Sequence, residues 1–188
     1  MKEIDWNKLR DEAHVNSVEH GWWEGTPSDK HFLCLVISEL MEAVEADRKN
    51  AHSDESILDC FMEPEKYKGS IGFNGYFEMN IKDTVEDELA DAVIRLLDLA
   101  GQHNIDIHTS TIENISKDSL SLRQNSFTEL IYGIVSTITD QINIYITIEV
   151  VIAQIVGLSK LLNINLVKHI ELKMRYNELR PYKNGKKY

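Results

Sequence analysis

The sequence of 188 residues contains few residues that break regular structure, with only three prolines and nine glycines. This composition provides little material for the many tight turns of a β-sandwich, and it favours long helices. A chain of this length fits one domain with its own core, so we expect one domain over residues 1–188. With 43% hydrophobic and 27% charged residues, it should be folded throughout. The sequence therefore predicts a single all-α domain.

Cysteine and positive charge are also scarce. The two cysteines, Cys34 and Cys60, form neither a Cys-x-x-Cys pair nor a zinc-binding spacing. The first ten residues contain no apolar signal core, and we expect a cytoplasmic protein. Its 20 Lys and Arg residues are outnumbered by 31 Asp and Glu residues, for a net charge of -11. This charge disfavours nucleic acid polymers and membranes as partners.

Hydrophobic periodicity and capping residues predict the helices. Ser28 is a preferred N-cap residue, and Asp83 or Thr84 offers the same function at the start of a later helix. Gly101 marks the end of that later helix. The pattern predicts helices over residues 2–19, 29–49, 84–101, 127–162 and 166–179.

Two stretches interrupt this helical pattern. Residues 50–80 contain Pro64, several glycines and the turn signal Asn74-Gly75, and we interpret them as an insertion. Residues 102–126 are rich in Ser, Asn and Thr, and we assign no element to them.

The most apolar segment, residues 127–162, has a mixed pattern. Four isoleucines from Ile142 to Ile148 alternate with other residues as they would in a strand, whereas the flanking residues keep helical spacing. Because a lone short strand would have no partner, we predict a helix with a bend near Asn143. Polar residues such as Glu149 interrupt the run, which argues against a membrane span.

Two pairs of acidic residues are the main candidates for a functional site. Glu39 and Glu42 are three residues apart on one predicted helix, and Glu88 and Asp91 are three apart on another, so each pair projects from nearly one face. Small and apolar residues share these faces, which is not typical of a solvated surface. Four carboxylates brought together repel one another unless cations intervene. Mg²⁺ takes oxygen ligands and leaves room for phosphate oxygens. The pairs therefore predict a Mg²⁺ site, with Mn²⁺ as the alternative ion.

The alternative interpretation is a structural one. Acidic pairs with this spacing are common on helix surfaces, and Arg95 lies four residues after Asp91, where it would form a surface ion pair. A di-iron site is excluded, because it requires Glu-x-x-His on two helices and the sequence has none.

Three segments resemble the MazG-like, all-α nucleoside triphosphate pyrophosphohydrolases. The motifs E-x-x-E and E-x-x-D of this family are similar to Ser38-Glu39-Leu40-Met41-Glu42-Ala43 and Asp87-Glu88-Leu89-Ala90-Asp91-Ala92. A similar tail ends many chains of the family, here Lys173-x-x-Tyr176-Asn177-x-x-Arg180-Pro181-Tyr182-Lys183-Asn184-Gly185-Lys186. Two features depart from the family: the stretch between the paired motifs is longer, and Asn184 stands where a histidine is expected.

The resemblance implies a helical bundle, with an insertion between its two metal-binding helices, that forms a homodimer or homotetramer. It implies hydrolysis of a nucleoside triphosphate between the α and β phosphates, with a nucleoside monophosphate and pyrophosphate as products. The metal ligands would be Glu39, Glu42, Glu88 and Asp91, and Glu39 or Glu42 would orient or deprotonate the attacking water. The matching tail residues Lys173, Asn177 and Arg180 would bind the nucleotide.

Further candidates for nucleotide binding flank these motifs. Trp22 and Trp23 precede the first acidic helix, where we expect one ring to stack on a base and the other to pack. Lys30 is placed to reach a phosphate, and residues 181–188 form a basic tail. Two non-enzymatic functions remain open, a nucleotide-sensing helical bundle and an oligomeric scaffold.

Overall fold

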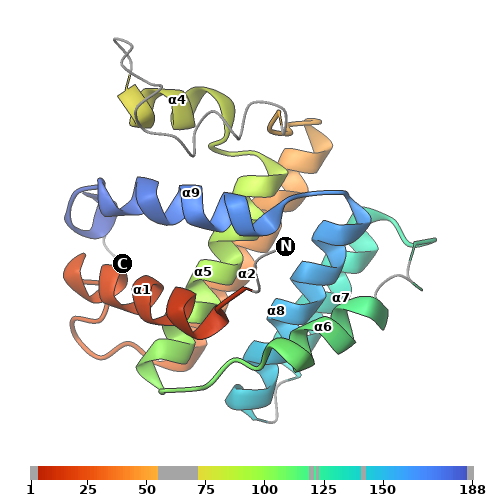
Figure 1. Ribbon diagram of the computed structural model, residues 1–188, viewed down its shortest axis with the longest axis horizontal. Helices are drawn as coiled ribbons and strands as arrows, with labels where there is room; N and C mark the ends of the chain where they lie inside the picture. The colour runs from red at the N-terminus through yellow and green to blue at the C-terminus, as the bar shows by residue number, and fades with distance from the viewer. Residues whose placement is uncertain (1–3, 55–71, 119–120, 122, 141–142, 186–188) are drawn as a thin grey trace.

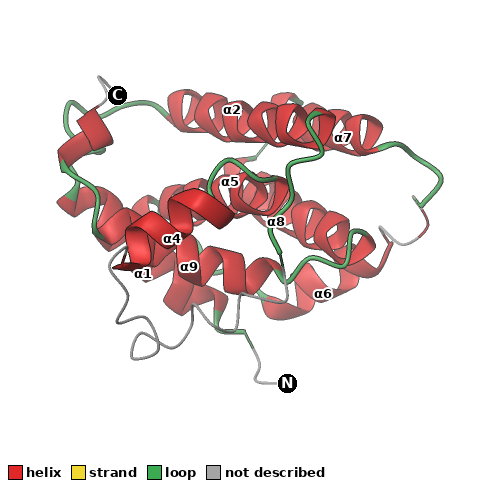
Figure 2. Cartoon of the chain, turned by 90° about the horizontal axis from the view of Figure 1, so that it is seen from above, coloured by secondary structure: helices red, strands yellow, loops and turns green. Residues whose placement is uncertain are grey.

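The computed structural model describes residues 4–54, 72–118, 121, 123–140 and 143–185. These residues form eight α-helices and a short 3-10 helix, with no strand among them (Figure 2). The prediction of an all-α fold is thus confirmed. Labelled as in Figure 1, the α-helices are α1 (Trp6–Glu19), α2 (Asp29–Arg48), α4 (Gly72–Asn80), α5 (Val85–Gln102), α6 (Thr109–Asp118), α7 (Phe127–Thr139), α8 (Ile144–Leu161) and α9 (Leu166–Glu178). The 3-10 helix is Tyr182–Gly185.

The helices that carry the acidic pairs begin at predicted caps. The Ser28 side chain accepts a hydrogen bond from the His31 N–H at the start of α2. Thr84, rather than Asp83, caps α5 by accepting from the Asp87 N–H. These caps set where each helix begins, and the three-residue spacing then places each acidic pair on one face of its helix.

Two predictions about element boundaries are corrected. The segment 127–162 contains two helices instead of one bent helix, because Asn143 caps the start of α8 with its side chain. Helix α6 lies within the polar stretch 102–126, where none was predicted, and it buries Ile112 and Ser116. Within the insertion, residues 72–80 form α4, whereas Pro64 lies outside the described residues.

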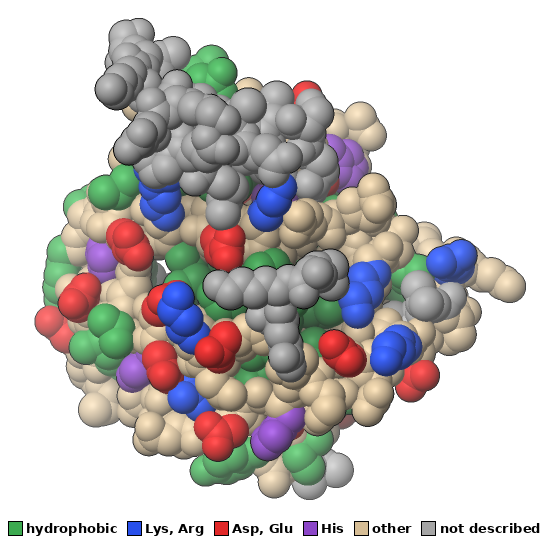
Figure 3. Space-filling model, in the orientation of Figure 1, with side chains coloured by type: hydrophobic (Ala, Val, Ile, Leu, Met, Phe, Trp, Pro, Cys, Tyr) green, Lys and Arg blue, Asp and Glu red, His purple; other side chains and the backbone are tan. Residues whose placement is uncertain are grey.

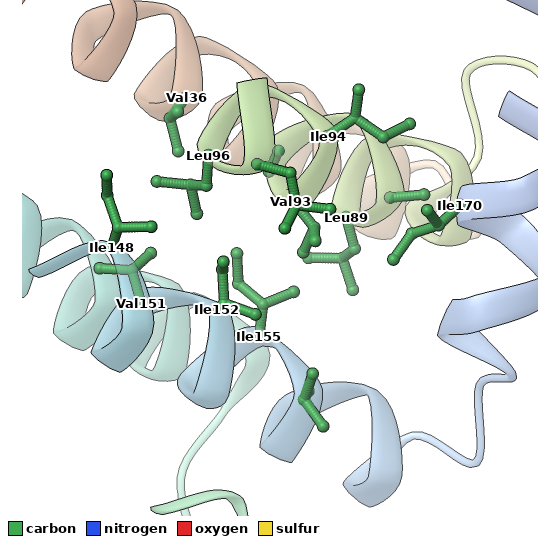
Figure 4. Close-up of a cluster of buried hydrophobic side chains, with 14 of the residues drawn as sticks. Val36, Leu89, Val93, Ile94, Leu96, Ile148, Val151, Ile152, Ile155 and Ile170 are labelled. Carbon is green, nitrogen blue, oxygen red and sulfur yellow. The ribbon is translucent and has the colours of Figure 1, made fainter. Parts of the chain in front are cut away.

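Helix α5 occupies the centre of the molecule, and it packs against α1, α2, α8 and α9 (Figure 1). Fourteen of its side chains are buried, including those of its polar residues Glu86, Asp87, Glu88 and Asp98. The core between α5 and α8 consists of branched aliphatic residues such as Leu89, Val93, Ile152 and Ile155 (Figure 4). Burial of such side chains stabilises the fold by about 1.5–3 kcal/mol each.

Helices α6, α7 and α8 lie on the opposite side of α5 from α1 (Figure 1). Among the described residues, α8 is the one helix that has the length and apolarity of a membrane span, and 56% of it is buried inside the protein. Core helices of soluble proteins share these properties. The α1 side of α5 holds the acidic residues.

Candidate functional site

A cavity of about 500 Å³ lies between α1, α2, α5, α9 and the chain that follows α9. Four polar side chains of α5 line it, Glu88, Asp91, Arg95 and Asp98. Their spacing of three, four and three residues keeps them on one face of the helix. This polar stripe runs along an otherwise buried helix, and it extends from the acidic pairs to the loop after α1.

Three of the four predicted metal ligands meet at one end of this cavity. One carboxylate oxygen from each of Glu39, Glu42 and Glu88 lies within 4.8 Å of the other two. Two oxygen ligands of one Mg²⁺ are separated by at most about 4.2 Å, twice the usual metal–oxygen distance. Shifts of less than about 1 Å would therefore bring the three oxygens around one ion. Glu39 and Glu88 are buried, whereas Glu42 is exposed. These three carboxylates, which we term the acidic group, are open to the cavity on the side of Glu42.

Asp91 lines the cavity but is engaged by a lysine. Its Oδ2 lies 3.3 Å from Lys173 Nζ, which also forms a 2.8 Å bond with Asp87 Oδ2. Lys173 is only 5% exposed, so this is a buried ion pair. The fourth predicted ligand therefore has a cation of the protein beside it. The ammonium group predicted to bind nucleotide contacts two carboxylates.

Arg95 does not form the surface pair that the structural interpretation of the acidic residues requires. Its Nη2 lies 2.6 Å from Glu39 Oε1, and its Nε donates to the same oxygen at 2.8 Å. The pair joins α5 to α2 and holds one carboxylate of the acidic group in place. On the face of the molecule shown in Figure 3, Asp and Glu side chains also lie among Lys and Arg side chains.

The carboxylates of the cavity differ in proton affinity. Burial raises the pKa of Glu88 to about 9, and the Asp87 carboxylate acts in the same direction. Burial and then Asp91 raise the pKa of Glu39. For Asp91, burial also acts to raise the pKa, but Lys173 and Arg95 outweigh it and the pKa lies below its usual value. The acidic group therefore holds a proton at neutral pH, which a divalent cation would displace.

The two tryptophans have different environments. Trp22 lines the cavity. The ring of Trp23 stacks on Phe32 with a centroid distance of 4.1 Å, and its Nε1 donates to Asp98 Oδ1 at 2.8 Å. Trp23 does not line the cavity; its contacts with Phe32 and Asp98 fix it behind the wall, and Trp22 is the ring available to a ligand.

Asp98 is a polar centre of this wall that sequence analysis missed. Besides Trp23, its carboxylate contacts His14 Nδ1 at 2.8 Å and accepts from Ser17 Oγ at 2.7 Å. The available signal was its position seven residues after Asp91, two turns along the same helix face.

The predicted residues of the C-terminal region also reach the cavity. Asn177 and Arg180 line it, and Asn177 Oδ1 is buried with no hydrogen-bond partner among the described residues. Lys183, which was not predicted as a site residue, lines it too. Lys30 is exposed and is not part of the lining. The side chain of Asn184 lies outside the described part of the chain.

Comparisons of the chain with protein-family models, with curated proteins and with solved structures give no match.

Proposed function

We propose that the protein is a Mg²⁺-dependent nucleoside triphosphate pyrophosphohydrolase, which cleaves between the α and β phosphates to give a nucleoside monophosphate and pyrophosphate. The observation that carries the proposal is the approach of Glu39, Glu42 and Glu88, from two separate helices, to within 4.8 Å at the end of a cavity. Acidic side chains bind a polyphosphate only through bridging cations.

The dimensions of the cavity support a nucleotide over a bare phosphate. Its volume of about 500 Å³ falls in the usual range for sites that bind small molecules. Asp91 and Asp98 are seven residues apart on α5, a rise of about 10 Å. The acidic end would hold the α-phosphate, and the rest of the nucleotide would extend along the polar stripe toward Asp98 and the loop after α1. The resemblance of the acidic motifs and the C-terminal segment to the MazG-like family supports the same function.

The chemistry requires one metal-assisted displacement. Bound Mg²⁺ would polarise the α-phosphate, acidify a water molecule and neutralise the leaving group. Glu39, Glu42 and Glu88 would hold the ion, and Glu39 or Glu42 would accept the proton of the attacking water. The water oxygen forms a bond to the α-phosphorus, and the bond from that phosphorus to the bridging oxygen breaks. Pyrophosphate departs with the electron pair, and Arg180 is placed to neutralise its charge.

A substrate panel tests the proposal. The purified protein is incubated with standard and modified nucleoside triphosphates, with Mg²⁺ or with a chelator, and pyrophosphate and monophosphate are measured. We expect Mg²⁺-dependent release of both products in equal amounts. Release of inorganic phosphate instead would place the cleavage elsewhere, and metal-independent release would contradict the role of the acidic group.

Glu42→Gln is the matched active-site variant. Because Glu42 is exposed, loss of its charge should leave thermal stability nearly unchanged while turnover falls by about 100-fold or more. Glu45→Gln on the same helix is the control, since Glu45 pairs with Arg48 on the surface and lies outside the cavity. Equal activity of the two variants would remove Glu42 from the mechanism.

A nucleotide-sensing bundle is the second candidate, and one contact favours it. Lys173 beside Asp91 leaves three carboxylates rather than four for metal ions. Such a site would bind a metal–nucleotide complex without the metal arrangement needed for cleavage. Calorimetry separates the two functions, since nucleotide binding in Mg²⁺ without any product would support the sensor.

A further inference from the structure

The chain after α9 is fastened to the connection between α1 and α2. The Lys183 N–H donates to the His20 carbonyl at 3.0 Å, and His20 Nε2 lies 3.0 Å from the Arg180 carbonyl oxygen. The Tyr182 ring packs on Gly21, where any Cβ would overlap the ring. The Tyr182 hydroxyl also donates to Glu24 Oε2. These contacts hold the segment Arg180–Lys183, which we term the strap, against the cavity.

Lys183 occupies an unusual backbone conformation within the strap. Its φ of 46° lies in the left-handed region, which non-glycine residues adopt rarely. The hydrogen bond from its own N–H to the His20 carbonyl anchors the backbone at this position. The side chain lines the cavity, and its Nζ lies 3.4 Å from Glu24 Oε2. The backbone of Lys183 is therefore held at the cavity independently of what its ammonium group contacts.

Two other cations that line the cavity are bound to buried partners. Arg95 and Lys173 are bonded to the carboxylates of Glu39 and Asp87, which are 8% and 1% exposed. Breaking either pair would leave a buried carboxylate without its cation. The partner of Lys183 differs, because the side chain of Glu24 is 62% exposed and water can solvate it when the lysine departs.

We propose that Lys183 is a phosphate-binding residue whose ammonium group pairs with Glu24 when the cavity holds no ligand. A polyphosphate that enters the cavity replaces the Glu24 carboxylate as the partner of this ammonium group. This inference rests on the proposed function. The exchange replaces a solvent-exposed carboxylate by a polyanion inside the cavity, while Tyr182 keeps its hydrogen bond to Glu24. The strap stays docked through its backbone bonds to His20, and only the lysine side chain changes partner.

If the lysine changes partner in this way, substitutions of Lys183 and Glu24 should change the affinity for a polyphosphate in opposite directions. Lys183→Gln removes a charged contact to phosphate, so the dissociation constant of a polyphosphate should rise about tenfold. Glu24→Gln retains an acceptor for Tyr182 but no longer competes for the ammonium group, so the constant should fall about threefold. If the strap were only structural, both substitutions would weaken binding or leave it unchanged.

The test is a double-mutant cycle measured by calorimetry, with inorganic tripolyphosphate and Mg²⁺ as the probe. The four proteins are the wild type, Glu24→Gln, Lys183→Gln and the double variant, and Lys117→Gln on α6, outside the cavity lining, is the control. We expect the threefold gain from Glu24→Gln to disappear in the Lys183→Gln background. An undiminished gain there would mean simple repulsion by Glu24 and would overturn the proposal.

The remaining outcomes separate this proposal from the function on which it rests. If the wild type binds the probe and cleaves nucleotides, but Lys183→Gln binds as well as the wild type, Lys183 has no phosphate role and the function stands. If the wild type binds neither the probe nor any nucleotide in Mg²⁺, the proposed function and the role of Lys183 both fail.

Discussion

Arg95 and Glu39 form an ion pair between the two helices that carry the acidic residues, with 2.6 Å between Nη2 and Oε1. The carboxylate is 8% exposed and the guanidinium 24% exposed, so water screens the pair weakly. Arg95 thus acts as a permanent cation of the acidic group. Any divalent ion would add to a site that is already partly neutralised.

Arg95→Met tests this balance of charge. Removal of the guanidinium leaves Glu39 buried among acidic side chains, and the free energy of unfolding should fall by about 2–4 kcal/mol without metal. Mg²⁺ should restore more stability to this variant than to the wild type, because the ion supplies the missing positive charge. Urea denaturation with and without Mg²⁺ measures both effects. Arg48→Met is the control, since Arg48 forms an exposed pair with Glu45.

Lys173→Met tests the second internal cation. Asp87 is 1% exposed and its Oδ1 has no hydrogen-bond partner within the described part of the chain, so the loss of Lys173 should lower the free energy of unfolding by about 3–5 kcal/mol. Adding Asp87→Asn to this variant should restore part of the stability, since the buried charge is then removed as well. Denaturant titration of both variants gives the coupling. Strict additivity of the two changes would show that the ion pair does not stabilise the fold.

The raised pKa of Glu88 predicts how stability depends on pH in the absence of metal. With a pKa of about 9 in the folded protein and an ordinary value near 4.5 in the unfolded chain, Glu88 keeps a proton only when folded across this window. The folded state therefore binds more protons, and the contribution of Glu88 to stability falls as the pH rises from 4.5 to 9.

Glu88→Gln should flatten this part of the stability profile, because glutamine does not titrate. Melting curves from pH 5 to 9 in a chelator would show a smaller decline for this variant than for the wild type. Glu113→Gln, at an exposed position of α6, is the control and should retain the wild-type slope. Because Mg²⁺ must displace the proton from Glu88, the affinity of the wild type for Mg²⁺ should rise with pH.

Substitution of Trp22 should affect nucleotide binding, whereas substitution of Trp23 should affect stability. Trp22→Ala should weaken nucleotide binding by about 1–3 kcal/mol through lost stacking, while binding of tripolyphosphate, which has no base, stays unchanged. Trp23→Phe should mainly lower the free energy of unfolding, by about 1.5–3 kcal/mol, because Asp98 loses a charged hydrogen bond. Calorimetry with both ligands and thermal melting distinguish the two. Equal loss of nucleotide and tripolyphosphate binding in Trp22→Ala would exclude stacking.

Local sequence signals were sufficient for the helices that form the cavity. Ser28 and Thr84 are caps whose side chains bond the backbone a few residues away, so the sequence alone indicates them. Helix α6 was missed because it buries few residues within a polar segment, and its position depends on packing against α8. The break at Asn143 was predicted as a bend, since isoleucines continue on both sides of it.

The acidic residues of the cavity could be found by their spacing, but their cations could not. Arg95 and Glu39 are 56 positions apart in the chain, and Lys173 and Asp87 are 86 apart. No periodicity connects residues at such separations, so the sequence suggested a local pair of Arg95 with Asp91 instead. The strap was missed for the same reason, because its partners His20 and Glu24 lie at the other end of the chain.

The burial of most side chains of α5 limits how this cavity could be altered by protein engineering. Helix α5 supplies both the aliphatic core and the polar stripe, so its positions tolerate little change in volume. Attempts to change ligand preference should therefore begin with randomised libraries at Asn16, Trp22 and Leu35, which line the cavity from α1, the loop and α2.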